Sequence, residues 1–313
     1  FTGSGLVLFS MLLFIITNIF FEIALTISDS FFVHIATEKT AGRISGFAWG
    51  LGYIGGVVAL LLLRPLYVNG YTGEFEDMYK LTFPLVALFF LIFSFPSFLF
   101  IKDYGIKTKE SLVNLIRIGF NNAINTIKEV KKHKNIALFL LGFYILADGL
   151  VTLFAFVPIY AKTTLNLSLN EIMVILLIVY LVGFPSTVFF GWLSDKKGPR
   201  KILLVTLSIW IVIVLLISLS TNKLMFYTAA ILTGIVIGSS QSVARSWYSQ
   251  IIPKEKRSEF FGFNGFASKI AATTGPLIFG IISVVTSNQR IAMLSLLPYF
   301  ILSFVIFYKL GRE

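Results

Sequence analysis

The sequence has 313 residues, of which 57% are hydrophobic and only 13% are charged, and its mean hydropathy is +0.88. Soluble globular chains carry about a quarter charged residues, so this composition excludes an ordinary soluble domain and indicates a membrane protein. Cysteine is absent and the only two histidines, His34 and His133, fall at or near charged segments, so no metal site, cofactor or histidine-based catalytic centre is expected. The net charge of +11 does not indicate nucleic acid, because the basic residues cluster in short segments between apolar runs, as in cytoplasmic loops.

Nine apolar runs are each long enough to cross a bilayer as a helix, which takes about 20 residues. The runs are 6–33, 44–64, 82–101, 136–160, 170–193, 201–219, 224–243, 260–285 and 292–309. They are continuous rather than alternating, which excludes a β-barrel. The predicted fold is therefore an all-α membrane protein with about nine transmembrane helices, whose partner is the lipid bilayer.

Lysine and arginine predict the orientation of these helices. If the loop after the first run is cytoplasmic, twenty of these basic residues lie on that side of the membrane and five on the other. Cytoplasmic loops carry the excess of lysine and arginine, so the sequence predicts a cytoplasmic C-terminus.

The segment 102–135 divides the chain into unequal parts. Apolar residues between Ser111 and Lys134 fall near one helical face, which predicts an amphipathic helix on the cytoplasmic membrane surface; a solvated linker is the alternative. The predicted domains are a partial N-terminal bundle over 1–101, this linker over 102–135, and a six-helix bundle over 136–313. Transporters built from two parallel repeats have six spans on each side, and the chain begins with Phe1, so we expect three preceding spans to be absent.

Polar residues recur at helical spacing in four of the runs, which places each set on one face. Ionisable groups inside a membrane are costly and commonly functional, and Asp148 lies at the centre of its run. Such groups could bind a substrate or a proton, or they could form structural ion pairs or lie close enough to the interface to be solvated. The candidates for substrate or proton binding are Glu22, Asp29, Tyr144, Asp148, Thr152, Gln241, Arg245 and Lys269.

Glycines crowd the start of the second run, where small residues at spacings of about four allow helix backbones to approach closely. Helix packing is the expected role, and a sliding contact is the alternative. These helix-packing candidates are Gly46, Gly50, Gly52, Gly55 and Gly56.

The loop between the fifth and sixth runs carries the most specific motif, GWLSDKKGPRK over residues 191–201. Gly191 allows close packing at a helix end and Gly198 provides a turn. Asp195 is suited to accept hydrogen bonds from the N-terminus of a neighbouring helix, where the dipole favours an anion. The basic pair Arg200 and Lys201 could bind carboxylates or lipid phosphate.

This loop resembles the signature loop of the major facilitator superfamily in its second-half copy. Residues 43–56, RISGFAWGLGYIGG, resemble the fifth-helix signature of the vacuole-effluxer family, the autophagy-related amino-acid exporters and their bacterial relatives. The segment 241–246, QSVARS, followed by Ile252-Pro253 and by EFFG over 259–262, resembles that family around helices ten and eleven, and Asp148-Gly149 is similar in helix seven.

The resemblance implies that the nine runs are helices four to twelve of a major-facilitator-type bundle. It also implies that the polar faces of the first, fourth and seventh runs line a central cavity. Asp195 would lie near the N-terminus of the fifth helix, close to Arg43 and Ser45, as a gate contact that breaks during transport.

The predicted function is secondary active transport of a small solute, an amino acid or similar metabolite, by alternating access, with proton coupling as an open possibility. The alternatives are a non-transporting membrane protein or transporter remnant, and a membrane enzyme acting on lipid. No cysteine, histidine pair or metal-ligand cluster favours an enzyme. The composition, rich in Ile, Lys, Asn and Phe, suggests a bacterium of low genomic GC content and hence a plasma (inner) membrane.

Overall fold

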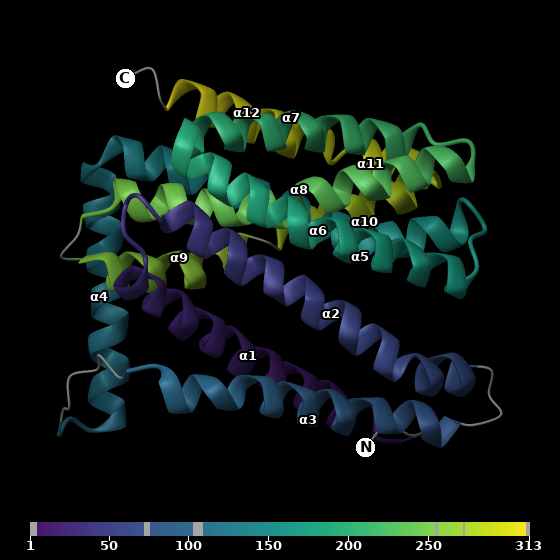
Figure 1. Ribbon diagram of the computed structural model, residues 1–313, viewed down its shortest axis with the longest axis horizontal. Coiled ribbons are helices and arrows are strands. Elements are labelled where there is room, and N and C mark those ends of the chain that lie inside the picture. Colours follow the sequence, from purple (N-terminus) through teal and green to yellow (C-terminus); the bar gives the residue numbers. More distant parts are fainter. Residues whose placement is uncertain (1–4, 72–75, 103–108, 254–255, 272, 311–313) are drawn as a thin grey trace. The chain divides into compact units, whose positions relative to one another are not determined.

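A computed structural model describes residues 5–71, 76–102, 109–253, 256–271 and 273–310 of the chain. All the regular elements in these ranges are helices (Figure 1), which confirms the all-α fold. The helices are α1 (Val7–Ile35), α2 (Ala41–Tyr71), α3 (Glu76–Phe100), α4 (Leu112–Lys132), α5 (Lys134–Thr163), α6 (Leu169–Lys197), α7 (Pro199–Ser218), α8 (Lys223–Ile251), α9 (Arg257–Ala271), α10 (Thr274–Thr286), α11 (Gln289–Leu294) and α12 (Leu297–Lys309).

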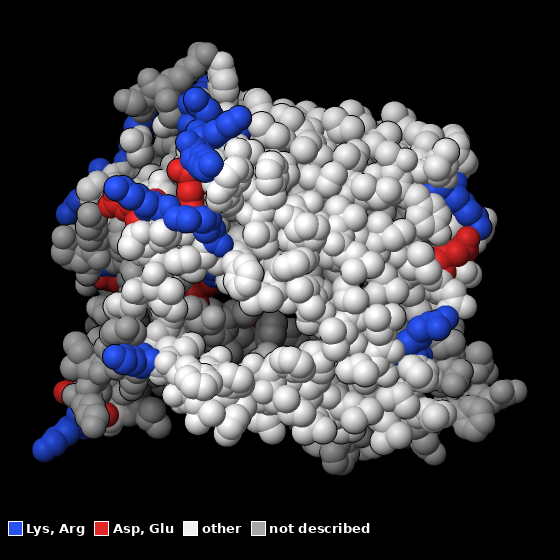
Figure 2. Space-filling view, viewed as in Figure 1, with Lys and Arg blue, Asp and Glu red and all other residues white. Residues whose placement is uncertain are grey.

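Eight segments of the described chain are long and apolar enough to cross a membrane, and they match eight of the nine predicted runs. Figure 2 shows a face over α6 and α7 on which the charged side chains lie at the ends of the helices, with uncharged side chains between them. This distribution suits helices whose middle sections contact lipid.

The remaining predicted run, 260–285, is not one helix but two, α9 and α10. Pro276 lies in the first turn of α10, where its missing N–H costs nothing, whereas inside a continuous helix it would clash with the preceding turn. The apolar run is continuous in sequence, and Pro276 fits the start of α10, although Pro158 and Pro185 lie inside the continuous helices α5 and α6.

The chain divides into two compact units, one of residues 1–23 and 55–121 and the other of residues 24–54 and 122–313. In the first unit α1 contacts α3, and the ring centroids of Phe21 and Phe90 are 6.4 Å apart. The boundaries between the units fall inside α1, α2 and α4, whereas the domains expected from the sequence are consecutive segments of the chain. That division into consecutive domains stays a prediction.

The core of the second unit is built from large aromatic side chains. Trp210 of α7 is fully buried and stacks on Phe300 of α12 with ring centroids 5.5 Å apart. Its indole N–H donates to Ser240 Oγ of α8 over 3.2 Å, so the polar edge of the ring is satisfied inside the core.

Close approaches of backbone join α6 to α2 and α8. A Cβ added to Gly46 would lie 2.6 Å from the carbonyl oxygen of Thr187, and one added to Gly50 would lie 3.1 Å from the Phe184 ring. In contrast, a Cβ added to Gly52 or Gly55 meets none of the described atoms within 4 Å, and Gly56 is half-buried. Gly46 and Gly50 are thus at close contacts, whereas Gly52 and Gly55 have open space beside them among the described atoms.

Helix α4 is amphipathic, as the sequence predicts. In its first half Val113, Ile116 and Phe120 have exposed side chains, at 75%, 73% and 67%. In its second half, which belongs to the second unit, Lys256 donates to Glu129, and the buried Thr126 donates to Glu259. The location of α4 on a membrane surface stays a prediction.

Candidate functional site

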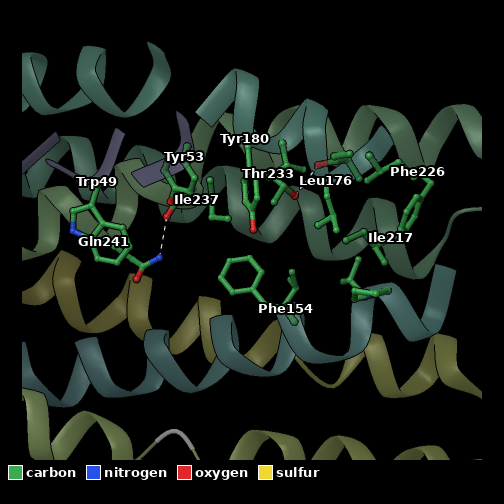
Figure 3. Close-up of a pocket in the computed structure, with 17 residues that line it drawn as sticks. Trp49, Tyr53, Phe154, Leu176, Tyr180, Ile217, Phe226, Thr233, Ile237 and Gln241 are labelled. Carbon is green, nitrogen blue, oxygen red and sulfur yellow. Dashed lines mark hydrogen bonds between the residues drawn. The ribbon is translucent and has the colours of Figure 1, made fainter. Parts of the chain in front are cut away.

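The second unit encloses a cavity of about 390 Å³ between α2, α5, α6 and α8, with one residue from α7 (Figure 3). Its lining residues are Trp49, Tyr53, Leu153, Phe154, Val157, Pro158, Ile175, Leu176, Val179, Tyr180, Ile217, Phe226, Ala229, Ala230, Thr233, Ile237 and Gln241. None of these described lining residues carries a charge at neutral pH. The cavity therefore suits the apolar part of a small molecule.

Polar groups in this cavity are few. The rings of Tyr53 and Tyr180 lie 5.7 Å apart, centroid to centroid, and Thr233 donates to the carbonyl of Ala229 over 2.8 Å. Gln241 lies at the end of the cavity beside Trp49, and its amide donates to the carbonyl of Ile237 over 3.2 Å (Figure 3). Gln241 and Trp49 thus lie at one end of the cavity, Tyr180 and Thr233 lie in its middle, and Ile217 and Phe226 lie at the opposite end (Figure 3).

A second, smaller cavity of about 60 Å³ shares Trp49 and Gln241 with the first, so the two adjoin at these residues. Its lining residues are Asp29, Trp49, Phe139, Phe143, Gln241, Ala244, Arg245, Tyr248, Phe261 and Asn264. The Trp49 indole nitrogen and the Asn264 side-chain oxygen are buried and have no hydrogen-bond partner among the described residues. Unpaired buried donors and acceptors are costly unless a ligand or water uses them.

The charged wall of the smaller cavity is an ion pair that joins three helices. Arg245 of α8 donates from Nη1 to Asp29 Oδ1 of α1 over 2.6 Å, and from Nε to Ser45 Oγ of α2 over 3.0 Å. Its guanidinium carbon lies 4.3 Å from the ring centre of Phe32. The Asp29 side chain is 41% exposed and that of Arg245 only 15%, so the carboxylate is the more accessible partner.

Three of the candidates from the sequence therefore come together: Asp29, Gln241 and Arg245. Glu22 is half-buried on α1 but belongs to the first unit, and the side chain of Lys269 on α9 lies outside the described residues. Tyr144, Asp148 and Thr152 of α5 line neither of the two adjoining cavities. The hydroxyl of Tyr144 is buried without a partner among the described groups.

Asp148 is engaged by another helix. The backbone N–H of Gly275 at the start of α10 lies 2.8 Å from Asp148 Oδ1 and 2.9 Å from Oδ2, and the hydroxyl of Thr274 donates to Oδ2. The aspartate is only 3% exposed, and its carbonyl accepts from Thr152 Oγ1 over 2.7 Å. This carboxylate caps a helix end.

Asp195 makes a similar contact at the start of α2. Its Oδ1 accepts from the N–H of Gly42 over 2.7 Å, and its Oδ2 accepts from the N–H of Arg43 over 2.9 Å. The Nε of Arg43 lies 3.3 Å from Oδ2, although the Arg43 side chain is 55% exposed. The structure thus places Asp195 at the helix N-terminus that the resemblance implies; its role as a gate stays a prediction.

The rest of the loop has other neighbours. Gly198 has φ +87°, which suits glycine, and it both ends α6 and precedes α7. Arg200 donates to the carbonyl oxygens of Phe307, over 3.3 Å, and Tyr308 at the end of α12, where a cation is favoured. These partners of Arg200 are backbone carbonyls; binding of carboxylates or lipid phosphate by the basic pair stays a prediction. Lys201 is exposed.

Sequence reasoning missed several residues of the two cavities, chiefly Trp49, Tyr53, Tyr180 and Asn264. They carry no charge, and the search for costly ionisable groups passes over them. Trp49 and Tyr53 lie within the glycine-rich segment 43–56, and aromatic residues there at a spacing of four could have indicated a lined face.

Comparison with solved structures identifies the fold. A crystal structure of a bacterial homologue of the iron transporter ferroportin in an outward-facing state superposes with a TM-score of 0.57 at 16% identity, covering 90% of this chain and 66% of that one. An uncharacterized MFS-type transporter of Bacillus subtilis, YxiO, is 26% identical over 303 residues, which are 95% of this chain and 69% of that protein. Autophagy-related protein 22 of Kluyveromyces lactis is 22% identical over 304 residues, covering 91% of this chain and 60% of the relative.

The helices, the fold and these relatives define the class, a multi-pass membrane protein of the major-facilitator transporter type. The chain belongs to the family of Atg22-like vacuole effluxers, whose family model matches residues 34–313. It spans between 60% and 69% of the length of the two relatives named above.

Proposed function

We propose that this chain forms part of a secondary transporter that moves a small zwitterionic solute with an apolar side chain, an amino acid or similar metabolite, by alternating access. The supporting observation is the junction of the two cavities at Trp49 and Gln241. An uncharged cavity of about 390 Å³ adjoins, at this junction, a cavity walled by an ion pair.

The apolar cavity would take the side chain of the solute. Its lining is aromatic and aliphatic, and transfer of an apolar group into such a site is favourable by roughly 25 cal/mol per Å² of buried surface. The same lining would reject a charged side chain, because an unpaired charge in an apolar site is not compensated.

The charged head of the solute would bind at the smaller cavity. A carboxylate would pair with Arg245 and an ammonium group with Asp29, so that the zwitterion replaces the internal ion pair with two pairs of its own. Trp49 Nε1 and Asn264 Oδ1, which have no partner among the described groups, would supply one further donor and one acceptor.

Alternating access would use contacts at the cytoplasmic ends of the helices. The charge asymmetry of the loops favours this side for Asp195, Arg43 and Arg245, with a cytoplasmic C-terminus and a plasma (inner) membrane as the location. Asp195 would hold the start of α2 against α6 in one state and release it in the other. Binding of a zwitterion at Arg245 would loosen a second contact in the same region.

The test is transport by the full-length gene product reconstituted in liposomes. Labelled leucine, phenylalanine, lysine and glutamate would be assayed separately, with and without an imposed pH gradient. We expect leucine and phenylalanine to move, and lysine and glutamate to be excluded. Stimulation of transport by the pH gradient would support proton coupling. Equal transport rates with and without the gradient would exclude proton coupling.

A matched pair of variants connects transport to the site. Gln241→Leu removes the amide at the junction, whereas Gln289→Leu removes an amide at the start of α11, whose side chain accepts from Thr163 and Thr164 instead. Only the first should impair transport. Failure to move any of the four solutes would contradict the proposal and favour a non-transporting membrane protein.

A further inference from the structure

We propose that Asp148 is a positioning residue, whose carboxylate on α5 caps the N-terminus of α10 and thereby fixes the interruption between α9 and α10. The carboxylate accepts the Gly275 N–H over 2.8 Å and the Thr274 hydroxyl. This role differs from the substrate or proton binding that its place in an apolar run first indicates, and its link to transport rests on the proposed function.

The start of α10 needs such a cap from outside. The first turn of a helix leaves N–H groups without intrahelical partners, and in a membrane no bulk water satisfies them. Thr273, the residue at the N-cap position, makes no side-chain capping hydrogen bond. Pro276 has no N–H to satisfy, and the Gly275 N–H is one of the first-turn groups that need an acceptor.

The site is shaped around glycine. A Cβ added to Gly275 would collide with the hydroxyl of Thr152 and lie 2.9 Å from Asp148 Oδ1 and 3.0 Å from the Asp148 carbonyl. Any larger residue would push the N–H away from the carboxylate. The aspartate, the glycine and the proline therefore act as one unit, although the aspartate is 127 positions away from the glycine.

The cap also explains how a 3% exposed carboxylate is tolerated. The described partners of Asp148 are hydrogen-bond donors at a helix N-terminus, where the partial positive charge of the helix dipole stabilises an anion. Tyr299 of α12 lies nearby, since a Cβ on Gly149 would be 3.0 Å from its Cβ.

The cap affects the candidate site through α9. Phe261 and Asn264, which line the smaller cavity beside Arg245, belong to this helix. If the cap at the start of α10 were lost, α9 and α10 would be free to reorient and would no longer hold these two side chains against the cavity.

Two substitutions, Asp148→Asn and Gly275→Ala, distinguish a carboxylate that caps a helix from one that carries a proton. Asp148→Asn cannot ionise but keeps an accepting oxygen, and asparagine caps helices about as well as aspartate. Gly275→Ala leaves the carboxylate chemically intact but breaks the cap. A proton carrier would be inactivated by Asp148→Asn, whereas a cap predicts that Asp148→Asn stays active and that Gly275→Ala does not.

The direct measurement is the distance between spin labels on α9 and α10 in the purified full-length protein in lipid nanodiscs. Gly262 and Gly280 suit the labels, because a Cβ at either position meets no described atom within 4 Å and residues 1–313 contain no cysteine to replace. The pair Gly262→Cys and Gly280→Cys should give one narrow distance in the parent and in Asp148→Asn. It should lose that single distance in Asp148→Ala and Gly275→Ala.

If Asp148→Ala does not fold, Thr274→Val is a milder variant. Thr274→Val should broaden the distribution of distances between the two spin labels. Its control is Thr206→Val, the same change at a buried hydroxyl that bonds within its own helix. An unchanged distance in Asp148→Ala or Gly275→Ala would overturn the proposal, and so would loss of the narrow distance in Asp148→Asn. Because this readout needs no transport, inactive protein with the predicted distances would count against the proposed function alone.

Discussion

Asp29 and Asp148 are both aspartates in apolar helices, yet their surroundings differ. Asp29 pairs with a guanidinium over 2.6 Å at the wall of a cavity, and its side chain is 41% exposed. Asp148 is 3% exposed, lines neither of the adjoining cavities and accepts hydrogen bonds from a helix N-terminus. In the proposed transporter the charge of Asp29 would exchange its partner for a ligand, whereas that of Asp148 would maintain the fold.

The largest expected effect comes from removing the partner of Asp29. Arg245→Leu removes the cation that holds Asp29 and that would bind a carboxylate, so transport of leucine should fall about a hundredfold. A hydrogen bond to a charged group contributes about 1.5–3 kcal/mol, which corresponds to one to two orders of magnitude. Initial rates in proteoliposomes measure the effect. Arg290→Leu is the control, because Arg290 donates to the carbonyl of Ser220 in the loop between α7 and α8.

The apolar cavity gives the next largest effect. Ala230→Leu adds three carbons to the lining, so the KM for phenylalanine should rise about tenfold while that for alanine changes much less. Ala48→Leu on the exposed side of α2 is the control and should change neither KM. Equal changes for phenylalanine and alanine would mean that the cavity does not hold the side chain.

A third carboxylate sharpens the comparison, because Asp195 caps a helix as Asp148 does but at the end of α6. Asp195→Ala should release the start of α2, with a cost of about 1 kcal/mol, or roughly a fivefold shift in the equilibrium. The reporter is Ser194→Cys, a position only 1% exposed and next to Gly42. Its reaction with a water-soluble maleimide should be about fivefold faster in the Asp195→Ala background. An unchanged rate would exclude a gate at this contact.

The smallest effect concerns the half-buried ion pair between α4 and the segment after α8. The hydrogen bond from Lys256 holds the pKa of the Glu129 carboxyl below its usual value, and the same bond raises the pKa of Lys256. The contribution of the pair to stability is therefore lost when the pH falls through the lowered pKa of Glu129 or rises through the raised pKa of Lys256.

Amide hydrogen exchange of residues 122–132, corrected for the intrinsic rate at each pH, checks this dependence. Protection should be constant through neutral pH and decline only in acid below the ordinary pKa of glutamate or in strong base. Lys256→Met should remove the decline. A midpoint near neutrality would mean that another group controls the contact.

The membrane class and the positions of eight spans could be predicted from the sequence, because run length is a direct consequence of the bilayer, and the family from the resemblance of its motifs. The break in the run 260–285 could not, since apolar composition is continuous across it. Pro276 was the local signal, but the cap that stabilises the break comes from Asp148 on α5. Hydropathy reports local composition and contains no information about such a distant partner.

The candidate site was partly predictable for the same reason. Asp29, Gln241 and Arg245 stand out as polar groups in apolar runs, and they do come together. The neutral wall of the cavity does not stand out, because Trp49 and Tyr53 resemble the other aromatic residues of the spans. Only their position in the lining of the cavity distinguishes these two residues, and this position depends on how the helices pack.

The central claim is that the two adjoining cavities bind an apolar zwitterion, and equilibrium binding to the purified full-length protein tests it most directly. Leucine would be compared with two analogues of the same apolar body, 4-methylpentanoate, which lacks the ammonium group, and 3-methylbutylamine, which lacks the carboxylate. We predict that each analogue binds at least about tenfold more weakly than leucine, because each leaves Asp29 or Arg245 without its new partner. Equal binding of leucine and either analogue, or no binding of leucine, would contradict the claim.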